Sequence, residues 1–156
     1  MNYQKVFKII SPVVPTFNRN EKQKRKDQRK LYRYLKEQHG IVKGIKGNLK
    51  FYKPHKLWAR IFYFNHDSIT SAKDIHNIIK PLFDDLEDYV YDDDKQIIIF
   101  EGTRLDMEDV DEAFVIEFLD YDMPDIQKIL QETCCLVEIG ILPFIEESTI
   151  LKITWL

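Results

Sequence analysis

The chain has 156 residues, enough for one compact domain with a proper hydrophobic core and too few to expect two. Its 44% hydrophobic and 13% aromatic residues exclude wholesale disorder, and no apolar run approaches the roughly 18 residues that a membrane span needs. The net charge of -3 conceals a strong division, because residues 1–80 carry 19 Lys and Arg against 5 Asp and Glu, whereas residues 81–156 carry 4 against 21.

The first half of the chain is predicted to contain two strands. Residues 5–10 are typical of a strand that ends where Pro12 and Pro15 forbid continued pairing. Residues 57–64 are rich in aromatic and aliphatic side chains, which favours a central strand. The first ten residues are too polar and too few for a signal peptide, so we expect an intracellular, cytoplasmic protein.

A basic helix is predicted between these strands, over residues 21–40. Leu31, Tyr34 and Leu35 share one helical face, and Gly40 provides a stop signal. Glycines then punctuate a loop that carries several lysines. The predicted helix is amphipathic only in its second half. Its first half consists of charged and polar residues that are expected to face solvent.

The second half alternates predicted strands and helices without a strict βαβ rhythm. Strands are expected over residues 95–103, 112–119, 135–141 and 149–156, and a short helix over residues 123–131. The adjacent Cys134 and Cys135 rarely fit disulfide geometry, so reduced, partly buried thiols are expected. The pattern predicts an α+β fold in which a mixed β-sheet packs with helices.

The most unusual segment spans residues 73–97, where eight acidic residues and three lysines surround an apolar stripe. The stripe has helical spacing, and Asp74 is a natural N-cap because its carboxylate can accept from the free amides of the first turn. Pro81 cannot bond back to Asn77, so the helix either kinks there or begins near Pro81.

Polar residues of this segment lie opposite its apolar stripe and in the turn that follows. His76, Lys80 and Asp84 are four residues apart and form a polar stripe opposite the isoleucines. Residues 92–94 are three aspartates in a tight connection beside the helix, and their spacing leaves open whether they reach Asp74. If they do, the neighbouring carboxylates raise one another's pKa unless a cation lies between them, and a divalent metal bound there is then the simplest explanation.

The stretches DIHNIIKPLFDDL and YDDDKQI, between Asp74 and Ile97, resemble the signature of RusA-type Holliday junction resolvases. That signature is roughly D-x-D-N-x-x-K-x-x-x-D-x-L followed by D-D-x-Q-[IV], and this chain supplies its elements in order at the right separation. The opening strand, the proline-rich SPVVPTFNRN and the basic segment give looser support.

The resemblance implies a RusA-like domain over residues 1–156 that acts as a homodimeric, Mg²⁺-dependent endodeoxyribonuclease. Such an enzyme resolves four-way junctions by paired nicks in recombination and repair, in a phage, prophage or bacterial chromosome. The metal ligands implied are Asp74, His76 and Asp94, and the catalytic set adds Lys80. Asn77 and Asp93 match positions with supporting roles.

One departure from the RusA pattern is His76, which stands where the family has its second aspartate. Mg²⁺ prefers oxygen ligands, whereas imidazole suits Mn²⁺ and other transition metals better. His76 therefore either changes the metal preference, or leaves Asp74 and Asp94 with waters to hold the ion, or marks a RusA-like scaffold that binds DNA or protein without catalysis. With the metal in place, His76 is a ligand or a general base.

The basic segment is the candidate DNA-binding surface, because cations that neutralise phosphates release counterions. The candidate contacts are Arg19, Lys22, Lys24, Arg25, Lys26, Arg29, Lys30 and Arg33. The same run also fits a solvated helix face, and the acidic second half also fits a protein that sequesters a basic partner. The segment from about residue 121 is longer than expected of a minimal resolvase, and we interpret it as a family-atypical extension.

Overall fold

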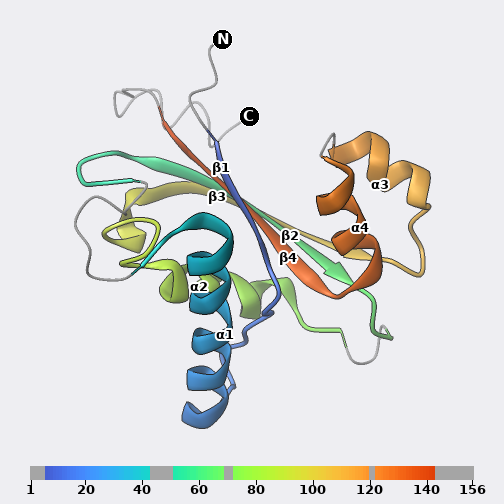
Figure 1. Ribbon diagram of the computed structural model, residues 1–156, viewed down its shortest axis with the longest axis horizontal. Helices are drawn as coiled ribbons and strands as arrows, with labels where there is room; N and C mark the ends of the chain where they lie inside the picture. Colours follow the sequence, from blue (N-terminus) through green and yellow to red (C-terminus); the bar gives the residue numbers. More distant parts are fainter. Residues whose placement is uncertain (1–5, 43–50, 69–71, 120–121, 143–156) are drawn as a thin grey trace.

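The computed structural model describes residues 6–42, 51–68, 72–119 and 122–142, and their strands form one four-stranded sheet (Figure 1). The strands are β1 (Phe7–Ser11), β2 (Leu57–Asn65), β3 (Ile97–Asp106) and β4 (Cys134–Ile141), in the spatial order β1-β4-β2-β3. β4 runs antiparallel to β1 and β2, whereas β2 and β3 are parallel. This mixed sheet confirms the predicted α+β fold.

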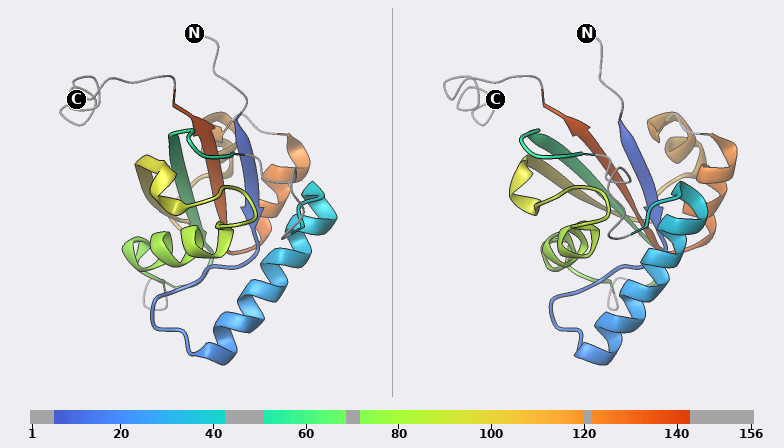
Figure 2. Two further views of the ribbon diagram at one scale, coloured as in Figure 1. Left: turned by 90° about the vertical axis from the view of Figure 1, so that its left-hand side faces the viewer. Right: turned by 60° about the vertical axis from the view of Figure 1, so that its left-hand side comes forward.

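Helices cover both faces of the sheet (Figures 1 and 2). They are α1 (Glu21–His39), α2 (Ile75–Leu86), α3 (Glu112–Leu119) and α4 (Met123–Gln131). α1 and α2 pack on one face and α3 and α4 on the other, so successive strand residues such as Ile61 and Phe62 belong to different cores. None of the described helices is long and apolar enough to cross a membrane.

Helix α1 begins and ends where its sequence predicts. The Asn20 side chain caps the first turn by accepting a hydrogen bond from the Gln23 amide at 2.8 Å. Gly40 ends the helix in the left-handed conformation, with φ of 65°, which a residue without Cβ adopts at low cost. Leu31 and Leu35 are fully buried, which confirms the predicted apolar face.

Helix α2 is continuous from Ile75, so it does not begin near Pro81, which lies buried inside it. The helix packs closely over β3 because Gly102 has no side chain. A Cβ atom at Gly102 would lie 2.8 Å from Cδ1 of Ile79. This close approach sets the position of α2, whose polar face carries the predicted site.

The strand expected over residues 112–119 is wrong, because this segment is helix α3. Its buried residues, Val115 and Leu119, are four apart, which is a helical spacing. The Asp111 carboxylate accepts from the Ala113 amide at 3.1 Å, as an N-cap does. The abundance of β-branched and aromatic residues suggested a strand, but the i, i+4 burial on the sheet determines the structure.

The carboxyl-terminal part of the described chain belongs to the centre of the sheet. β4 lies between β1 and β2, and its Cys134 and Cys135 are buried and unlinked. Burial raises the pKa of the Cys134 thiol to about 12. The strand expected over residues 149–156 lies outside the described residues. Because β4 completes the sheet, the segment after residue 121 contributes to the core of the fold.

Candidate functional site

The acidic turn, residues 92–96, is held in shape by its own side chains. Asp93 caps the 3-10 turn Asp94–Gln96: its carboxylate accepts from the Lys95 amide at 2.9 Å, and its own amide donates to the Gln96 side chain at 3.0 Å. Such reciprocal capping satisfies two backbone amides at once. Asp93 and Gln96 therefore build the turn, and Asp94 is left to face α2.

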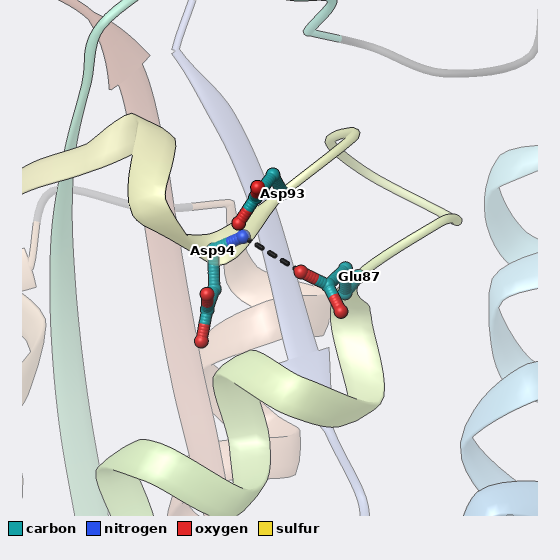
Figure 3. A group of neighbouring side chains, drawn as sticks. All are labelled: Glu87, Asp93 and Asp94. Atoms are coloured by element: carbon teal, nitrogen blue, oxygen red, sulfur yellow. Dashed lines mark hydrogen bonds between the residues drawn. The ribbon is translucent and has the colours of Figure 1, made fainter.

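Three carboxylates meet where the acidic turn passes the end of α2 (Figure 3). Glu87, Asp93 and Asp94 each offer an oxygen atom, and these atoms lie within 4.8 Å of one another. Glu87 also accepts a hydrogen bond from the Asp94 amide at 2.9 Å. The hydrogen bond from the Lys95 amide lowers the pKa of Asp93, which keeps this carboxylate ionised at neutral pH. Hard oxygen donors at this spacing fit a divalent cation such as Mg²⁺.

Lys80, near the middle of α2, joins the helix to the acidic turn. Its ammonium group donates to Asp84 at 2.8 Å, one helical turn away, and to the carboxylate of Asp94. These two hydrogen bonds raise the pKa of Lys80. The side chain is therefore a permanent positive charge at neutral pH, able to attract a phosphate but unable to accept a proton.

Asp74 and His76 lie at the other end of α2. Asp74 is the N-cap, as predicted, and accepts from the His76 amide at 3.3 Å, while both residues are exposed. Asp74 precedes the helix and Glu87 follows it, so 12 residues, about 18 Å of helix, separate them. The acidic group in the structure shares only Asp94 with the predicted ligand set. The assignment of Asp74 and His76 as metal ligands stays a prediction.

Seven of the eight candidate DNA contacts are exposed on α1, whose first turns extend beyond the sheet (Figures 1 and 2). They are Lys22, Lys24, Arg25, Lys26, Arg29, Lys30 and Arg33. Their concentration on a projecting helix gives this part of the molecule a positive surface. That surface suits a polyanion, although their role in DNA binding stays a prediction.

Arg19, the eighth candidate, is placed differently. Its side chain is only 6% exposed, and its guanidinium group forms two hydrogen bonds of 2.9 Å with the buried Asp85 and one of 3.2 Å with Asp27. Gln28 adds a third hydrogen bond to Asp85 at 3.0 Å. Arg19 therefore joins the start of α1 to α2, and its role as a DNA contact stays a prediction.

A groove of about 290 Å³ lies between the first turns of α1 and the chain that precedes them. Lys26, Lys30 and Lys73 line it together with Arg19. Lys73 is the residue before Asp74, and its ammonium group donates to the Val14 carbonyl at 2.6 Å. The groove thus connects the basic surface of α1 with the amino-terminal end of α2.

Comparison with known protein families shows to which family this chain belongs. The family model described as Endodeoxyribonuclease RusA matches residues 12–108, which is more than half of the chain and includes α1, α2 and the acidic turn. The chain belongs to the RusA endodeoxyribonuclease family. A search of curated proteins finds no match.

Membership of the RusA family confirms the resemblance found in the sequence and makes the chain one of a family of endodeoxyribonucleases that resolve Holliday junctions. The matched residues contain every predicted site residue, from Arg19 to Asp94. The match ends before α3, so α3, α4 and β4 lie beyond it. The prediction that residues from about 121 are atypical of the RusA family stays a prediction.

The sequence reasoning did not identify Glu87, Asp85 and Gln96 as parts of the site. The signal for Gln96 was present, because an Asp followed three residues later by Gln is a capping-box pattern. Glu87 and Asp85 offered no local signal. Arg19 is 66 residues from Asp85 in the chain, and the Asp94 amide meets Glu87 only because the chain turns back after α2.

Proposed function

We propose that the protein is a metal-dependent, structure-selective endodeoxyribonuclease that resolves four-way DNA junctions in recombination and repair. The main support for the proposal comes from α2, which lies within the RusA match. The basic groove reaches the amino-terminal end of this helix, and Lys80 near its middle donates a hydrogen bond to Asp94 of the acidic turn. Metal-dependent cleavage of DNA uses both parts: cations that hold the DNA and acidic groups that hold a divalent metal.

The proposed metal ligands are Asp74 and Asp94, with His76 either as a third ligand or as the base that takes a proton from the attacking water. Bound Mg²⁺, or Mn²⁺ if His76 is a ligand, would acidify that water and polarise the phosphate. Lys80 stabilises negative charge that builds on the phosphate during cleavage. Asp93 supports the site by fixing the turn that presents Asp94.

Asn77 has a supporting role in the proposed site. Its carbonyl oxygen accepts a hydrogen bond from the Phe17 amide at 3.2 Å. This bond holds the chain before α1, which forms one wall of the basic groove, against the first turn of α2. The groove and the residues that surround Asp74 therefore keep a fixed spacing.

The proposed substrate path follows the basic groove. Lys26, Lys30 and Lys73 bind successive phosphates of one strand, which directs the strand toward the exposed Asp74 and His76. The protein is proposed to act as a homodimer, since two symmetric nicks across a junction favour a two-fold pair of active sites. A cytoplasmic location, where chromosomal DNA is accessible in bacteria, belongs to the same proposal.

Cleavage of a synthetic four-way junction tests the proposal. Labelled junction and matching linear duplex are incubated with the protein in Mg²⁺ and separately in Mn²⁺, and the products are separated on a denaturing gel. We expect paired nicks in the junction and none in the duplex. Light scattering is expected to give twice the chain mass of 18.7 kDa.

Two variants make this experiment specific. Asp94→Asn is expected to bind the junction and leave it uncut, whereas Asp88→Asn, which changes an exposed carboxylate nearby, is expected to cut normally. Binding without cleavage in both metals would instead show a RusA-like scaffold that has lost catalysis. Equal cutting of junction and duplex would contradict structure selectivity.

A further inference from the structure

We propose that α3 and its surroundings form a docking site for a basic, amphipathic protein segment. This face is independent of the proposed nuclease site: α3 and α4 cover the face of the sheet opposite α1 and α2 and lie beyond the RusA match (Figures 1 and 2). A segment bound there leaves the basic groove open. The docking face is defined by Phe114 and Phe118, one helical turn apart on α3, in a region rich in acidic residues.

The docking face leaves large apolar side chains exposed to solvent, although other residues of α3 already pack against the sheet. Val115 and Leu119 already bury the inner side of α3, yet Phe114 is 48% exposed and Phe118 52%. The Phe114 and Phe118 rings stack with centroids 5.4 Å apart. Neighbouring exposed aromatic side chains of this kind mark interaction surfaces rather than ordinary solvent-facing positions.

The part of the chain that contains this apolar face is strongly acidic. From Leu105 to Leu142 the sequence has a single Lys or Arg, which is Lys128. The exposed acidic residues of this region are Glu108, Asp109, Asp111, Glu112, Glu117, Asp122 and Glu132. Their charge repels DNA and also repels the same face of a second copy, whereas it attracts a cationic partner.

A pocket beside α3 matches one basic side chain of such a partner. The pocket has a volume of about 320 Å³ and combines the apolar Met107, Val110 and Leu130 with His66 and the carboxylates of Glu108 and Glu112. An arginine or lysine has the complementary structure, with an apolar stem that packs on the hydrophobic wall and a charged end that meets the carboxylates. The occupant is therefore a helix with leucine-like residues on one side and Arg or Lys at its edges.

The test measures binding of a fluorescein-labelled amphipathic helical peptide of Leu, Lys and Arg to the full chain by fluorescence anisotropy. A scrambled peptide of the same composition separates the docking face from simple charge attraction. We expect the amphipathic peptide to bind at least tenfold more tightly than the scrambled one. Phe114→Ser, and separately the pair Glu108→Gln with Glu112→Gln, are each expected to weaken its binding at least tenfold.

Matched controls change similar residues elsewhere. Phe100→Ser removes another exposed phenylalanine and Glu101→Gln another exposed carboxylate, both on β3, and neither is expected to alter binding. Each variant is checked by thermal melting and for unchanged junction binding. Equal binding of the scrambled peptide, or undiminished binding by Phe114→Ser, would overturn the proposal. A lower mass of Phe114→Ser in light scattering would also overturn it, because a second copy would then cover this face.

Discussion

The two ends of α2 differ in how firmly their polar side chains are held. At the carboxyl-terminal end, Asp85 is buried against Arg19, and Glu87 accepts the amide of Asp94. At the amino-terminal end, Asp74 and His76 are exposed, and the hydrogen bond between them caps the helix backbone. One end is organised by the fold, and the other presents its polar groups to solvent.

This difference indicates a division of labour along one helix. A binding site is precise when rigid neighbours hold its groups, so the acidic turn offers a preformed carboxylate, Asp94. Exposed groups at the amino-terminal end are accessible to a large substrate such as DNA. Lys80 lies between the two ends and contacts the rigid one. Apart from those at the proposed ligand Asp94, substitutions at the rigid end should therefore affect stability first, and substitutions at the exposed end should affect activity first.

The largest expected effect on stability comes from Arg19→Ala. It leaves the Asp85 carboxylate, which is fully buried, without its main counter-charge, and breaking a buried ion pair typically costs about 3–5 kcal/mol. The free energy of unfolding in urea measures this loss. Arg25→Ala, an exposed change on the same helix, is expected to stay within about 0.5 kcal/mol of the parent protein.

A double variant separates the charge effect from lost packing. Arg19→Met combined with Asp85→Leu removes both charges, and similar replacements elsewhere are neutral or stabilising, so it should recover most of the lost stability. If Arg19→Ala is as stable as Arg25→Ala, the rigid end of α2 does not depend on this pair.

The next effect distinguishes two candidate sets of metal ligands that share Asp94. One set adds Asp74 and His76, and the other adds Glu87 and Asp93. Asp74→Asn keeps a side chain that caps the helix but removes a proposed ligand, so we expect cleavage to fall about 100-fold, or about 2.7 kcal/mol, with the fold unchanged. Glu87→Gln keeps an acceptor for the Asp94 amide and should lower cleavage less than about threefold, a change below about 0.7 kcal/mol. Single-turnover cleavage of the junction measures both. The reverse ranking would assign the metal to Glu87, Asp93 and Asp94.

A smaller effect is expected when the acidic turn is loosened. Gln96→Ala removes the acceptor of the Asp93 amide and the hydrogen bond of 3.1 Å to the His55 carbonyl, which together should cost about 1–2 kcal/mol. Urea unfolding measures the loss, with the exposed Lys95→Ala as the neighbouring control. Equal stability of the two variants would show that the turn keeps its shape without the capping box.

Local patterns in the sequence were sufficient to predict the helices and the cap that position this site. The Asp74 cap, the apolar face of α1 and the spacing of Lys80 and Asp84 follow from helical periodicity, and the structure has all three. The mixed sheet was predicted because strands and helices interleave without a strict βαβ rhythm. Such features depend on residues close together in the chain, which is why the sequence alone predicts them.

Contacts between distant segments were not predictable in this way. Glu87 joins the site because the chain turns back over the end of α2, and Arg19 is buried because Asp85 lies opposite it. A run of charge such as residues 19–33 does not reveal which basic residue faces inward. The wrong strand at residues 112–119 has the same origin, since burial against the sheet, rather than β propensity, decided its structure.

The smallest effect should appear in the salt dependence of DNA binding. The double change Lys26→Gln with Lys30→Gln removes two cations from the groove at the exposed end of α2. Each phosphate contact contributes about 0.9 to the slope of log K against log salt, so the slope should fall by about 1 to 2 while cleavage at saturating protein is retained. Lys36→Gln, near the other end of α1, removes a cation outside the groove and should leave the slope unchanged. An equal fall in both proteins would mean that α1 attracts DNA through its overall charge, with no defined path toward Asp74.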